Sequence, residues 1–332
     1  MTCSSTATTV TRRTREVAFD GELRIVSRRA EADGVISLRL ATGTGDPLPE
    51  WSPGAHLDVL LPTGFVRQYS LCGPVEDRST WRIGVLRESD GRGGSAWLHD
   101  NATEGGLLRV RGPRNNFPLL PARRYVFIAG GIGITPLLPM IAEAQRAGAD
   151  WVLHYGGRTS TSMAFLPELR GHAGRVLVRP EDTQGRLDLA AVLGEPQPST
   201  LVYCCGPGGL IDAVRDRCRG WPAGSLHVER FTPVEPPEDE VADGPATEVE
   251  CTRSGVTLTV PPGTSILEAA ERAGISVLSS CSEGICGTCE TEVLGGEVEH
   301  RDSVLTDEER EEGETMMICV SRARGGRLVL DL

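Results

Sequence analysis

The chain has 332 residues, of which 24% are charged, and its formal net charge at pH 7 is −12. This length suffices for two or three domains, and an acidic balance without a basic stripe excludes nucleic acid as a partner. No stretch approaches the roughly 18 apolar residues of a membrane span, and ten cysteines without a secretory leader indicate a reducing compartment. We therefore expect a soluble, cytoplasmic monomer that has no membrane contact.

The N-terminal third divides into a tail and a strand-rich region. Residues 1–18 are rich in Ser, Thr and Arg and hold few apolar residues, so we expect a disordered tail and not a transit peptide. Residues 19–121 contain short segments with turn signals between them, such as ELRIVSRRAE, AHLDVLLP and WRIGVLRES. Many short strands at close spacing predict an antiparallel β-barrel.

Two stretches of the predicted barrel carry groups that suit a phosphorylated ligand. In RQYS, the residues Arg67, Tyr69 and Ser70 offer a cation, an aromatic face and a hydroxyl. In GRGGSAWLHD, a glycine turn ends in Ser95 before a helix, whose N–H groups and dipole favour an anion. Taken alone, ordinary barrel packing and a plain turn explain these stretches equally well.

Residues 122–232 alternate between apolar strands and helix-length segments. The predicted strands are RYVFIAG, WVLHYGG, RVLVRP, TLVYCCG and SLHVERF, and the longest predicted helices are TPLLPMIAEAQRAG and GLIDAVRDRC. Strands separated by helical crossovers predict a parallel sheet that is covered on both faces. Such sheets bind nucleotides at the carboxyl ends of their strands.

The run AGGIGITP lies at the carboxyl end of the first of these strands. Gly131 and Gly133 let the backbone approach a pyrophosphate. Thr135 can cap the following helix, and Pro136 suits its first turn. A purely structural turn explains this run equally well when it is taken alone. The run CGPGG at 205–209 ends a later strand of the same sheet, so the two loops can flank one nucleotide.

The C-terminal third follows a predicted linker. Residues 233–246, PVEPPEDEVADGPA, combine prolines and acids with few apolar residues and predict an extended linker. Residues 247–332 give a strand pair, a helix that Ser265 and Glu268 open as a capping box, a cysteine-rich loop, a second short helix from Thr306, and final strands. This order predicts a small α+β domain. It holds 17 acidic residues and 7 arginines, a formal charge of −10.

Four cysteines of this region show the spacing of metal ligands. Three lie in SSCSEGICGTCETEV and one in MMICVSRA, and the pattern is C-x4-C-x2-C followed after 29 residues by the last cysteine. This is the ligand pattern of a plant-type [2Fe–2S] ferredoxin. The candidate ligands are Cys281, Cys286, Cys289 and Cys319. The alternatives are zinc, which usually takes two separated C-x2-C pairs, and disulfides, which are typical of small secreted chains.

In their order along the chain, the motifs RQYSLCG, GRGGSAWLHD, AGGIGITP, YCCGPGGL, HVERF and CSEGICGTC resemble the phthalate dioxygenase reductase family of the ferredoxin–NADP⁺ reductase superfamily. The resemblance runs from about residue 20 to the C-terminus. It implies an FMN-binding β-barrel domain at 19–121, an NADH-binding α/β domain at 122–232 and a β-grasp ferredoxin domain at 247–332. Electrons would pass from NADH to FMN, to the cluster, and to a terminal oxygenase that docks at the acidic ferredoxin domain. That oxygenase is usually a Rieske non-haem iron hydroxylase or demethylase.

The resemblance also implies roles for single residues. Those that would contact the flavin or its phosphate are Arg67, Tyr69, Ser70, Gly94 and Ser95. Those that would contact NADH are Gly131, Gly133, Thr135, Cys205, Gly206 and Pro207. Phe231 would cover the isoalloxazine ring, and a strand-end core residue is the alternative for it. The residues closest to the reaction would be Ser70, Cys205 and Phe231.

Several alternatives stay open at this point. Arg158 and Ser160, in GGRTSTSM, could meet a 2′-phosphate, so NADPH is not excluded as the donor. No residue visibly forbids FAD in place of FMN. The same three-domain module can feed the haem iron of a cytochrome P450. A redox sensor is a further alternative, against which stands the absence of a DNA-binding or effector segment.

Overall fold

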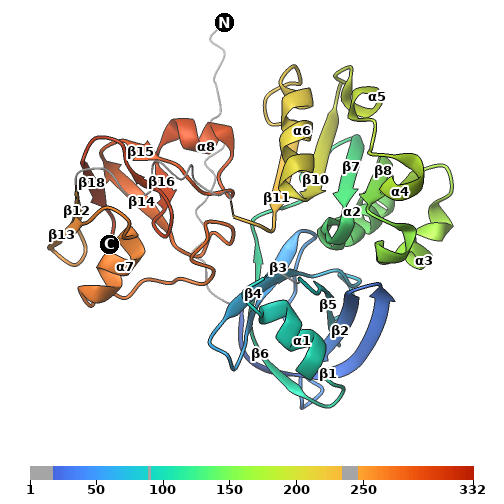
Figure 1. The fold of residues 1–332 in the computed structure, drawn as a ribbon, viewed down its shortest axis with the longest axis horizontal. Coiled ribbons are helices and arrows are strands. Elements are labelled where there is room, and N and C mark those ends of the chain that lie inside the picture. Colours follow the sequence, from blue (N-terminus) through green and yellow to red (C-terminus); the bar gives the residue numbers. More distant parts are fainter. Residues whose placement is uncertain (1–17, 89–90, 234–245) are drawn as a thin grey trace, which may run out of the picture.

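The computed structural model describes residues 18–88, 91–233 and 246–332. These residues form three main sheets and one two-stranded ribbon. In Figure 1 the N-terminal sheet lies at the bottom, the middle sheet at the upper right and the C-terminal sheet at the left. The predicted tail at 1–18 and the predicted linker at 233–246 lie, apart from their end residues, outside the described residues.

The first sheet closes into a barrel, as predicted. Its elements are β1 (Phe19–Ala32), β2 (Val35–Ala41), β3 (Ala55–Leu60), β4 (Val66–Ser70), β5 (Trp81–Leu86), helix α1 (Gly94–Asn101) and β6 (Leu107–Asn115). The strand order is β4-β3-β6-β1-β2-β5, and every pairing is antiparallel. The two edge strands meet where Leu71 bridges to Ile83 and the Cys72 N–H donates to the Arg82 carbonyl at 2.9 Å. Buried leucine, isoleucine and valine side chains fill the interior.

The middle sheet is parallel, in the order β11-β10-β7-β8-β9. Its elements are β7 (Arg124–Gly130), η1 (Gly131–Gly133), α2 (Ile134–Arg146), β8 (Asp150–Gly157), η2 (Ser160–Ser162), α3 (Leu166–Leu169), η3 (Arg170–His172), β9 (Val176–Pro180), α4 (Glu181–Gln184), α5 (Leu189–Leu193), β10 (Thr200–Gly206), α6 (Gly208–Cys218) and β11 (Leu226–Arg230). Along β7, Tyr125 and Phe127 enter one apolar core, while Val126 and Ile128 enter another. Because successive side chains of a strand point to opposite faces, the sheet is covered on both faces, as predicted.

The C-terminal sheet is mixed. Its elements are β12 (Thr247–Cys251), β13 (Val256–Val260), α7 (Ile266–Arg272), β14 (Glu290–Gly295), β15 (Val298–Glu299), α8 (Asp307–Glu312), β16 (Thr315–Met317), β17 (Arg322–Ala323) and β18 (Arg327–Leu330). The order is β13-β12-β18-β14-β16, in which β12 and β18 are parallel, and β15 pairs with β17. Ser265 and Thr306 open α7 and α8 as capping boxes, with Glu268 and Glu309 as their partners, as predicted.

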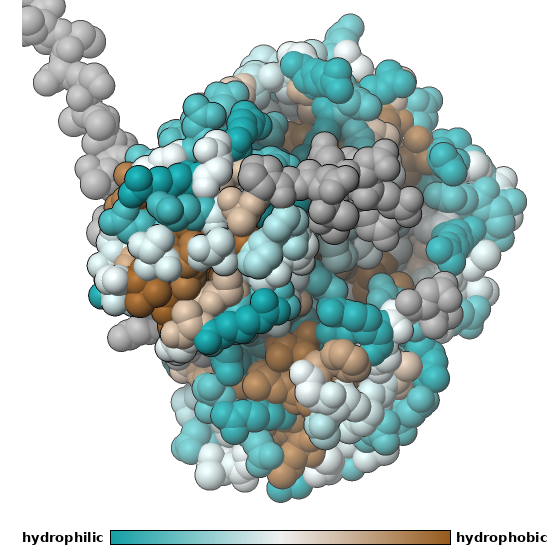
Figure 2. Space-filling view, turned by 60° about the vertical axis from the view of Figure 1, so that its left-hand side comes forward, coloured by the Kyte–Doolittle hydropathy of each residue, from teal (hydrophilic) through white to brown (hydrophobic). Residues whose placement is uncertain are grey.

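The surface shows no large apolar area on the face drawn in Figure 2, where hydrophilic residues predominate and apolar residues form small patches between them. Exposed large apolar side chains are spread over the three sheets and include Leu107, Leu177, Leu278 and Leu294. Scattered exposed leucines are normal on folded chains. In the part of the chain that the structure describes, no helix is long and apolar enough to cross a membrane.

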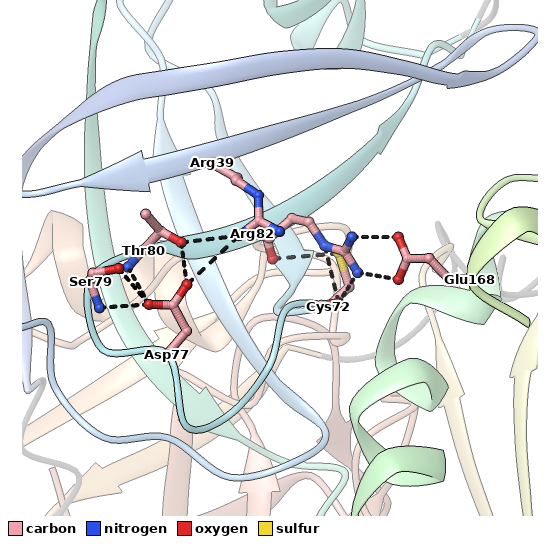
Figure 3. Close-up of polar contacts among 7 residues, drawn as sticks. All are labelled: Arg39, Cys72, Asp77, Ser79, Thr80, Arg82 and Glu168. Carbon is pink, nitrogen blue, oxygen red and sulfur yellow. Dashed lines mark hydrogen bonds and ion pairs between the residues drawn. The ribbon is translucent and has the colours of Figure 1, made fainter. Parts of the chain in front are cut away.

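A buried arginine joins the barrel to the parallel sheet (Figure 3). Arg82, on β5, donates from Nη1 and Nη2 to the two carboxylate oxygens of Glu168, on α3, at 2.5 and 2.9 Å. It also donates from Nε and Nη2 to the Cys72 carbonyl at 3.2 and 2.5 Å, and its guanidinium lies 5.1 Å from the Phe165 ring centre. Burial by itself would lower the pKa of Arg82, but the hydrogen bonds with Glu168 raise it overall, so the pair stays ionic.

A second network in Figure 3 fixes the loop before β5. Asp77 accepts hydrogen bonds from the backbone N–H groups and the hydroxyls of Ser79 and Thr80. Arg39 lies 3.7 Å from the same carboxylate. These hydrogen bonds, that of the Ser79 hydroxyl first, lower the pKa of Asp77. The start of β5, which carries Arg82, is thereby held in place.

We expect Glu168→Ala to weaken the joint between the barrel and the parallel sheet. The Arg82 side chain is only 10% exposed and would lose its charge partner. Hydrogen bonds to charged groups contribute about 1.5–3 kcal/mol, and because Glu168 is 43% exposed we expect a loss of about 1–2 kcal/mol in the free energy of unfolding. Urea unfolding followed by tryptophan fluorescence measures this loss.

The matched control for that change is Glu143→Ala. Glu143 pairs with Arg146 three residues along α2, with side chains 31% and 66% exposed. Exposed pairs of this kind contribute little to stability, so the control should lose much less than Glu168→Ala. Equal losses in the two variants would contradict a special role for Glu168.

Candidate functional site

The carboxyl ends of β7 and β10 pack together backbone to backbone, and glycine makes this possible. A Cβ on Gly133 would lie 2.2 Å from the Cys205 carbonyl oxygen, and a Cβ on Gly206 would lie 2.9 Å from the Gly130 Cα. No side chain fits at either place. Gly131 differs, because its φ is +55° and no atom lies within 4 Å of its added Cβ. The two predicted loops therefore lie side by side, and Gly131 leaves an open face for a ligand.

Thr135 does not cap α2, so that part of the prediction was wrong. The N-cap is Gly133, and no side chain caps the helix. Thr135 is the second helical residue, is 2% exposed, and donates its hydroxyl to the Ile132 carbonyl at 2.9 Å. Its methyl group packs against β5, since a Cβ on Gly84 would lie 2.8 Å from it. The turn η1 leads into the helix before Thr135, which is why Thr135 is not the cap. The contact of Thr135 with NADH stays a prediction.

Ser70, Cys205 and Glu229 meet where the barrel faces the parallel sheet. Ser70 ends β4, Cys205 lies near the end of β10, and Glu229 is opposite Cys205 on β11. The Ser70 hydroxyl is 3.5 Å and the Cys205 sulfur 3.9 Å from the Glu229 Oε2. Ser70 and Cys205 are 3% and 0% exposed. The structure thus brings together two predicted residues and one that the sequence analysis missed.

Glu229 is the titratable group of this cluster. Burial raises the pKa of its carboxyl to about 8, against the hydrogen bonds of Ser70 and Cys205, which lower it. Burial also raises the pKa of the Cys205 thiol well above its usual range. At neutral pH the Glu229 carboxyl group therefore keeps its proton and lies beside the uncharged Cys205 thiol. Shifted groups of this kind are frequent at functional sites.

Arg67 lies against the N-terminus of α1 and forms a cradle for an anion. The helix begins at Gly94, after Gly93 with φ 88°, and among the described residues the N-cap position provides no side-chain cap for its first N–H groups. A Cβ on Gly94 would lie 2.8 Å from the Arg67 Cγ and 2.9 Å from its Nε. Ser95 lies within the first turn, not before it as expected, and its Oγ accepts a hydrogen bond from the Glu88 N–H at 3.1 Å. A cation beside an uncapped helix N-terminus suits a phosphate.

The two aromatic candidates are both partly buried. Tyr69 packs on the barrel core, and burial raises the pKa of its phenol, so the ring stays neutral. Phe231 follows β11 and packs on the core that the barrel and the parallel sheet share. This core contact fits the alternative given for Phe231, and its contact with a flavin ring stays a prediction.

The four predicted ligand cysteines lie close together. Each is at most 6% exposed. Hydrogen bonds from Cys286 and Cys319 lower the pKa of the Cys281 thiol well below its usual range, and a hydrogen bond from Cys319 lowers the pKa of Cys289. The thiol contacts thus run from Cys286 through Cys281 and Cys319 to Cys289. Four thiols joined in this way can be divided into two pairs, one for each iron of a [2Fe–2S] centre.

The loop that carries these thiols turns its backbone toward the sulfurs. The Glu283 N–H donates to the Cys281 sulfur at 3.3 Å. Gly284 and Gly287 have φ values of 69° and 65°, which glycine adopts more readily than any other residue. Within the described ranges, no three His, Cys, Asp or Glu side chains are grouped so as to hold a single metal ion. The donors present fit a binuclear cluster, whose sulfurs accept backbone N–H groups.

We expect the isolated protein to contain about two iron atoms and two sulfides per chain. Cys289→Ser should lose most of the visible absorbance of the cluster, because one of four thiolate ligands is replaced by an alcohol. Iron and acid-labile sulfide assays measure this. The control is Cys218→Ser at the end of α6, which should keep the full iron content. Stoichiometric zinc without sulfide would contradict the assignment.

The raised pKa of Glu229 predicts a pH dependence of stability. The folded chain binds this proton more tightly than the unfolded chain, in which the usual value is 4.5. The contribution of this proton to the free energy of unfolding is complete below pH 4.5. It is lost as the pH rises to about 8, by at most ~1.4 kcal/mol per pH unit. Glu229→Gln should flatten this part of the profile, since an amide does not titrate. Urea unfolding across this pH range measures the effect. If the free energy of unfolding of the wild type and that of Glu229→Gln changed with pH in the same way, the expectation would be contradicted.

Comparison with known proteins agrees with this geometry. Residues 249–324, which contain the four cysteines, match the family of 2Fe-2S iron-sulfur cluster binding domains. The phenoxybenzoate dioxygenase subunit beta of Ectopseudomonas oleovorans is 43% identical over 316 residues, which cover 93% of this chain and 97% of that protein. An intact type IV self-sufficient cytochrome P450 monooxygenase is 43% identical over 97% of this chain, with a TM-score of 0.88. This chain spans 43% of the length of that P450.

The solved structure of phthalate dioxygenase reductase is described as modular, for electron transfer from pyridine nucleotides to [2Fe–2S]. It is 38% identical to this chain, has a TM-score of 0.69, and the match covers 94% of this chain and 98% of that one. This match confirms the predicted fold class, with a barrel, a parallel-sheet domain and a C-terminal ferredoxin domain. The chain belongs to the phthalate dioxygenase reductase family.

Proposed function

We propose that this chain is the NADH-dependent reductase component of a multicomponent oxygenase, and that it passes electrons through FMN and a [2Fe–2S] cluster to a terminal oxygenase. One observation carries the proposal: the short strand β4 of the barrel contacts both the parallel sheet and the cysteine loop. Ser70 approaches Glu229 of the parallel sheet at 3.5 Å, and Gln68 donates to Ser280, next to a cluster ligand, at 2.9 Å. The barrel thus lies between the nucleotide loops and the cysteine loop.

The barrel residues fit FMN. A flavin, when bound, accepts two electrons together from NADH and can release them one at a time to a cluster. Arg67 and the N-terminus of α1 would bind its single phosphate, and Tyr69 would lie along its ring. Family membership favours FMN over FAD. The domain boundaries that we propose are 19–121, 122–232 and 247–332, and each of these ranges contains one complete main sheet.

The residues at the junction would orient the nicotinamide and exclude water. Cys205, Gly206 and Pro207 follow each other at the end of β10, beside the open face of Gly131. Ser70 and Cys205 are almost fully buried, so little water reaches them. Glu229 holds its proton at neutral pH and keeps the pocket uncharged.

NADH is the donor that we propose. Arg158 is exposed after β8 and could attract a 2′-phosphate, but Glu181 and Asp182 follow the neighbouring strand β9 and are exposed as well. The Asp182 N–H donates to the Arg158 carbonyl at 3.1 Å, so the two turns adjoin. Carboxylates at this place favour a ribose hydroxyl over a phosphate.

A cytochrome P450 acceptor is the second candidate, and the match to a self-sufficient P450 supports it. The full-length relatives that act as separate subunits favour an independent oxygenase. Turnover with a purified Rieske oxygenase and with a purified P450 separates the two acceptors.

The order of electron transfer is tested with Cys289→Ser in the full chain. We expect this variant to reduce ferricyanide with NADH at a rate within severalfold of the wild type, because ferricyanide takes electrons directly from flavin. It should lose nearly all reduction of cytochrome c and of the oxygenase, because these receive electrons through the cluster. Full transfer to the oxygenase by the variant would show that the cluster is not the exit.

We expect the oxygenase to dock through charge at the ferredoxin domain. Glu311 and Glu312 of α8 are exposed, and complementary charges steer association. Electron transfer should slow as the ionic strength rises beyond ~0.15 M, where screening acts over ~8 Å. Exchanging both glutamates for glutamine should reduce this salt dependence, while Asp216→Asn on α6 should not. A rate that is independent of salt would argue for apolar docking.

A further inference from the structure

The cysteine loop is held against the barrel by polar side chains to which the sequence analysis assigned no role. Gln68 Nε2 donates to the Ser280 Oγ at 2.9 Å, and Asn116 Nδ2 donates to the Cys286 carbonyl at 2.7 Å. Arg92 forms an ion pair with Glu283. All three contacts fall on residues 280–286, the segment that carries the first two candidate ligands.

The amide of Gln68 is fixed by a buried ion pair. Its Nε2 also donates to the Asp58 Oδ1 at 2.9 Å, and Arg114 Nη2 lies 2.6 Å from the same oxygen. The side chains of Asp58 and Arg114 are 0% and 9% exposed. Loss of either partner would leave a buried charge unpaired, so the ion pair restrains the Asp58 oxygen that the Gln68 amide binds. Gln68 is thus presented to Ser280 in a fixed position.

Asn116 approaches the loop so closely that a side chain at position 287 would displace its amide. A Cβ on Gly287 would lie 2.8 Å from the Asn116 Nδ2. Gly287 therefore serves two purposes, since its φ of +65° also disfavours any other residue. The amide of Asn116 binds the carbonyl of Cys286 itself, which places the barrel directly on a ligand residue.

Gln68 lies between Arg67 and Tyr69, the residues assigned to the flavin, and Ser70 follows them. Successive side chains of a strand alternate between its two sides. Arg67 and Tyr69 therefore lie on one side of β4, and Gln68 and Ser70 lie on the other, so the residue that contacts the cysteine loop stands between residues assigned to the flavin. Any shift of β4 relative to the loop changes the separation of the two redox centres.

We propose that Gln68 and Asn116 are positioning residues for electron transfer from flavin to cluster: their two amides hold the segment 280–286 against the barrel at the distance that this step needs. The inference rests on the proposed function. One electron moves from the reduced flavin to the oxidised cluster, and no bond to either amide forms or breaks. The amides do not take part in the reaction of NADH with the flavin.

The test is the variant Gln68→Ala/Asn116→Ala in the intact, fully loaded protein. After rapid mixing with NADH, flavin bleaching should keep its wild-type rate, and cluster reduction should slow about tenfold, because two hydrogen bonds of the docked loop are lost. Amides in 280–288 should exchange with deuterium about tenfold faster, which reports docking without turnover. Asn116→Asp keeps the shape but sets a carboxylate against a carbonyl, and should slow cluster reduction at least as much as Asn116→Ala.

The matched control is Asn101→Ala/Gln145→Ala. Asn101 donates only to the Trp97 carbonyl within α1, and Gln145 is exposed on α2. This control should leave both rates and the exchange unchanged. Cluster reduction within twofold of the wild type and unaltered exchange in the Gln68/Asn116 variant would overturn the inference. If NADH failed to reduce the wild-type cluster, the proposed function would be wrong. The deuterium exchange measurement would still show whether Gln68 and Asn116 hold the segment 280–286 against the barrel.

Discussion

The buried pair of Asp58 and Arg114 is the constraint on which the arrangement of sites depends. Taking two charges out of water is costly, and the cost is offset only in one geometry with further hydrogen bonds. The pair joins β3 to β6, and the Gln68 amide adds β4 to it. Strand β4 carries three of the six residues that we assign to the flavin, Arg67, Tyr69 and Ser70. The position of the flavin site is therefore set by an ion pair that contacts neither cofactor in our assignment.

The features that follow from local chain geometry could be predicted from the sequence. The capping boxes at Ser265 and Thr306, the cysteine spacing and the strand alternation involve residues a few positions apart, and the structure has them as expected. Thr135 shows the limit even at short range, because the 3-10 turn leads into the helix earlier and the N-cap lies two residues before it, at Gly133.

The features that depend on which strands are neighbours could not be read from spacing. Glu229 stands in the motif HVERF, yet its importance comes from its register opposite Cys205 on a strand 24 residues away. Arg82 and Glu168 are 86 residues apart, and Gln68 and Ser280 are 212 apart. Such contacts are decided by how whole sheets pack, and nothing in either local sequence marks the partner. If the strand order β11-β10-β7-β8-β9 had been known from the sequence, it would have placed Glu229 beside Cys205.

The grip of Asn116 on the Cys286 carbonyl gives the cluster two unlike sides. Cys281 and Cys286 belong to the segment that the barrel covers, whereas Cys289 precedes β14 and Cys319 follows β16, within the ferredoxin sheet. An outside protein would therefore find the segment 280–286 already in contact with the barrel. The side of the thiol group that carries Cys289 and Cys319 would be the one left for such a protein.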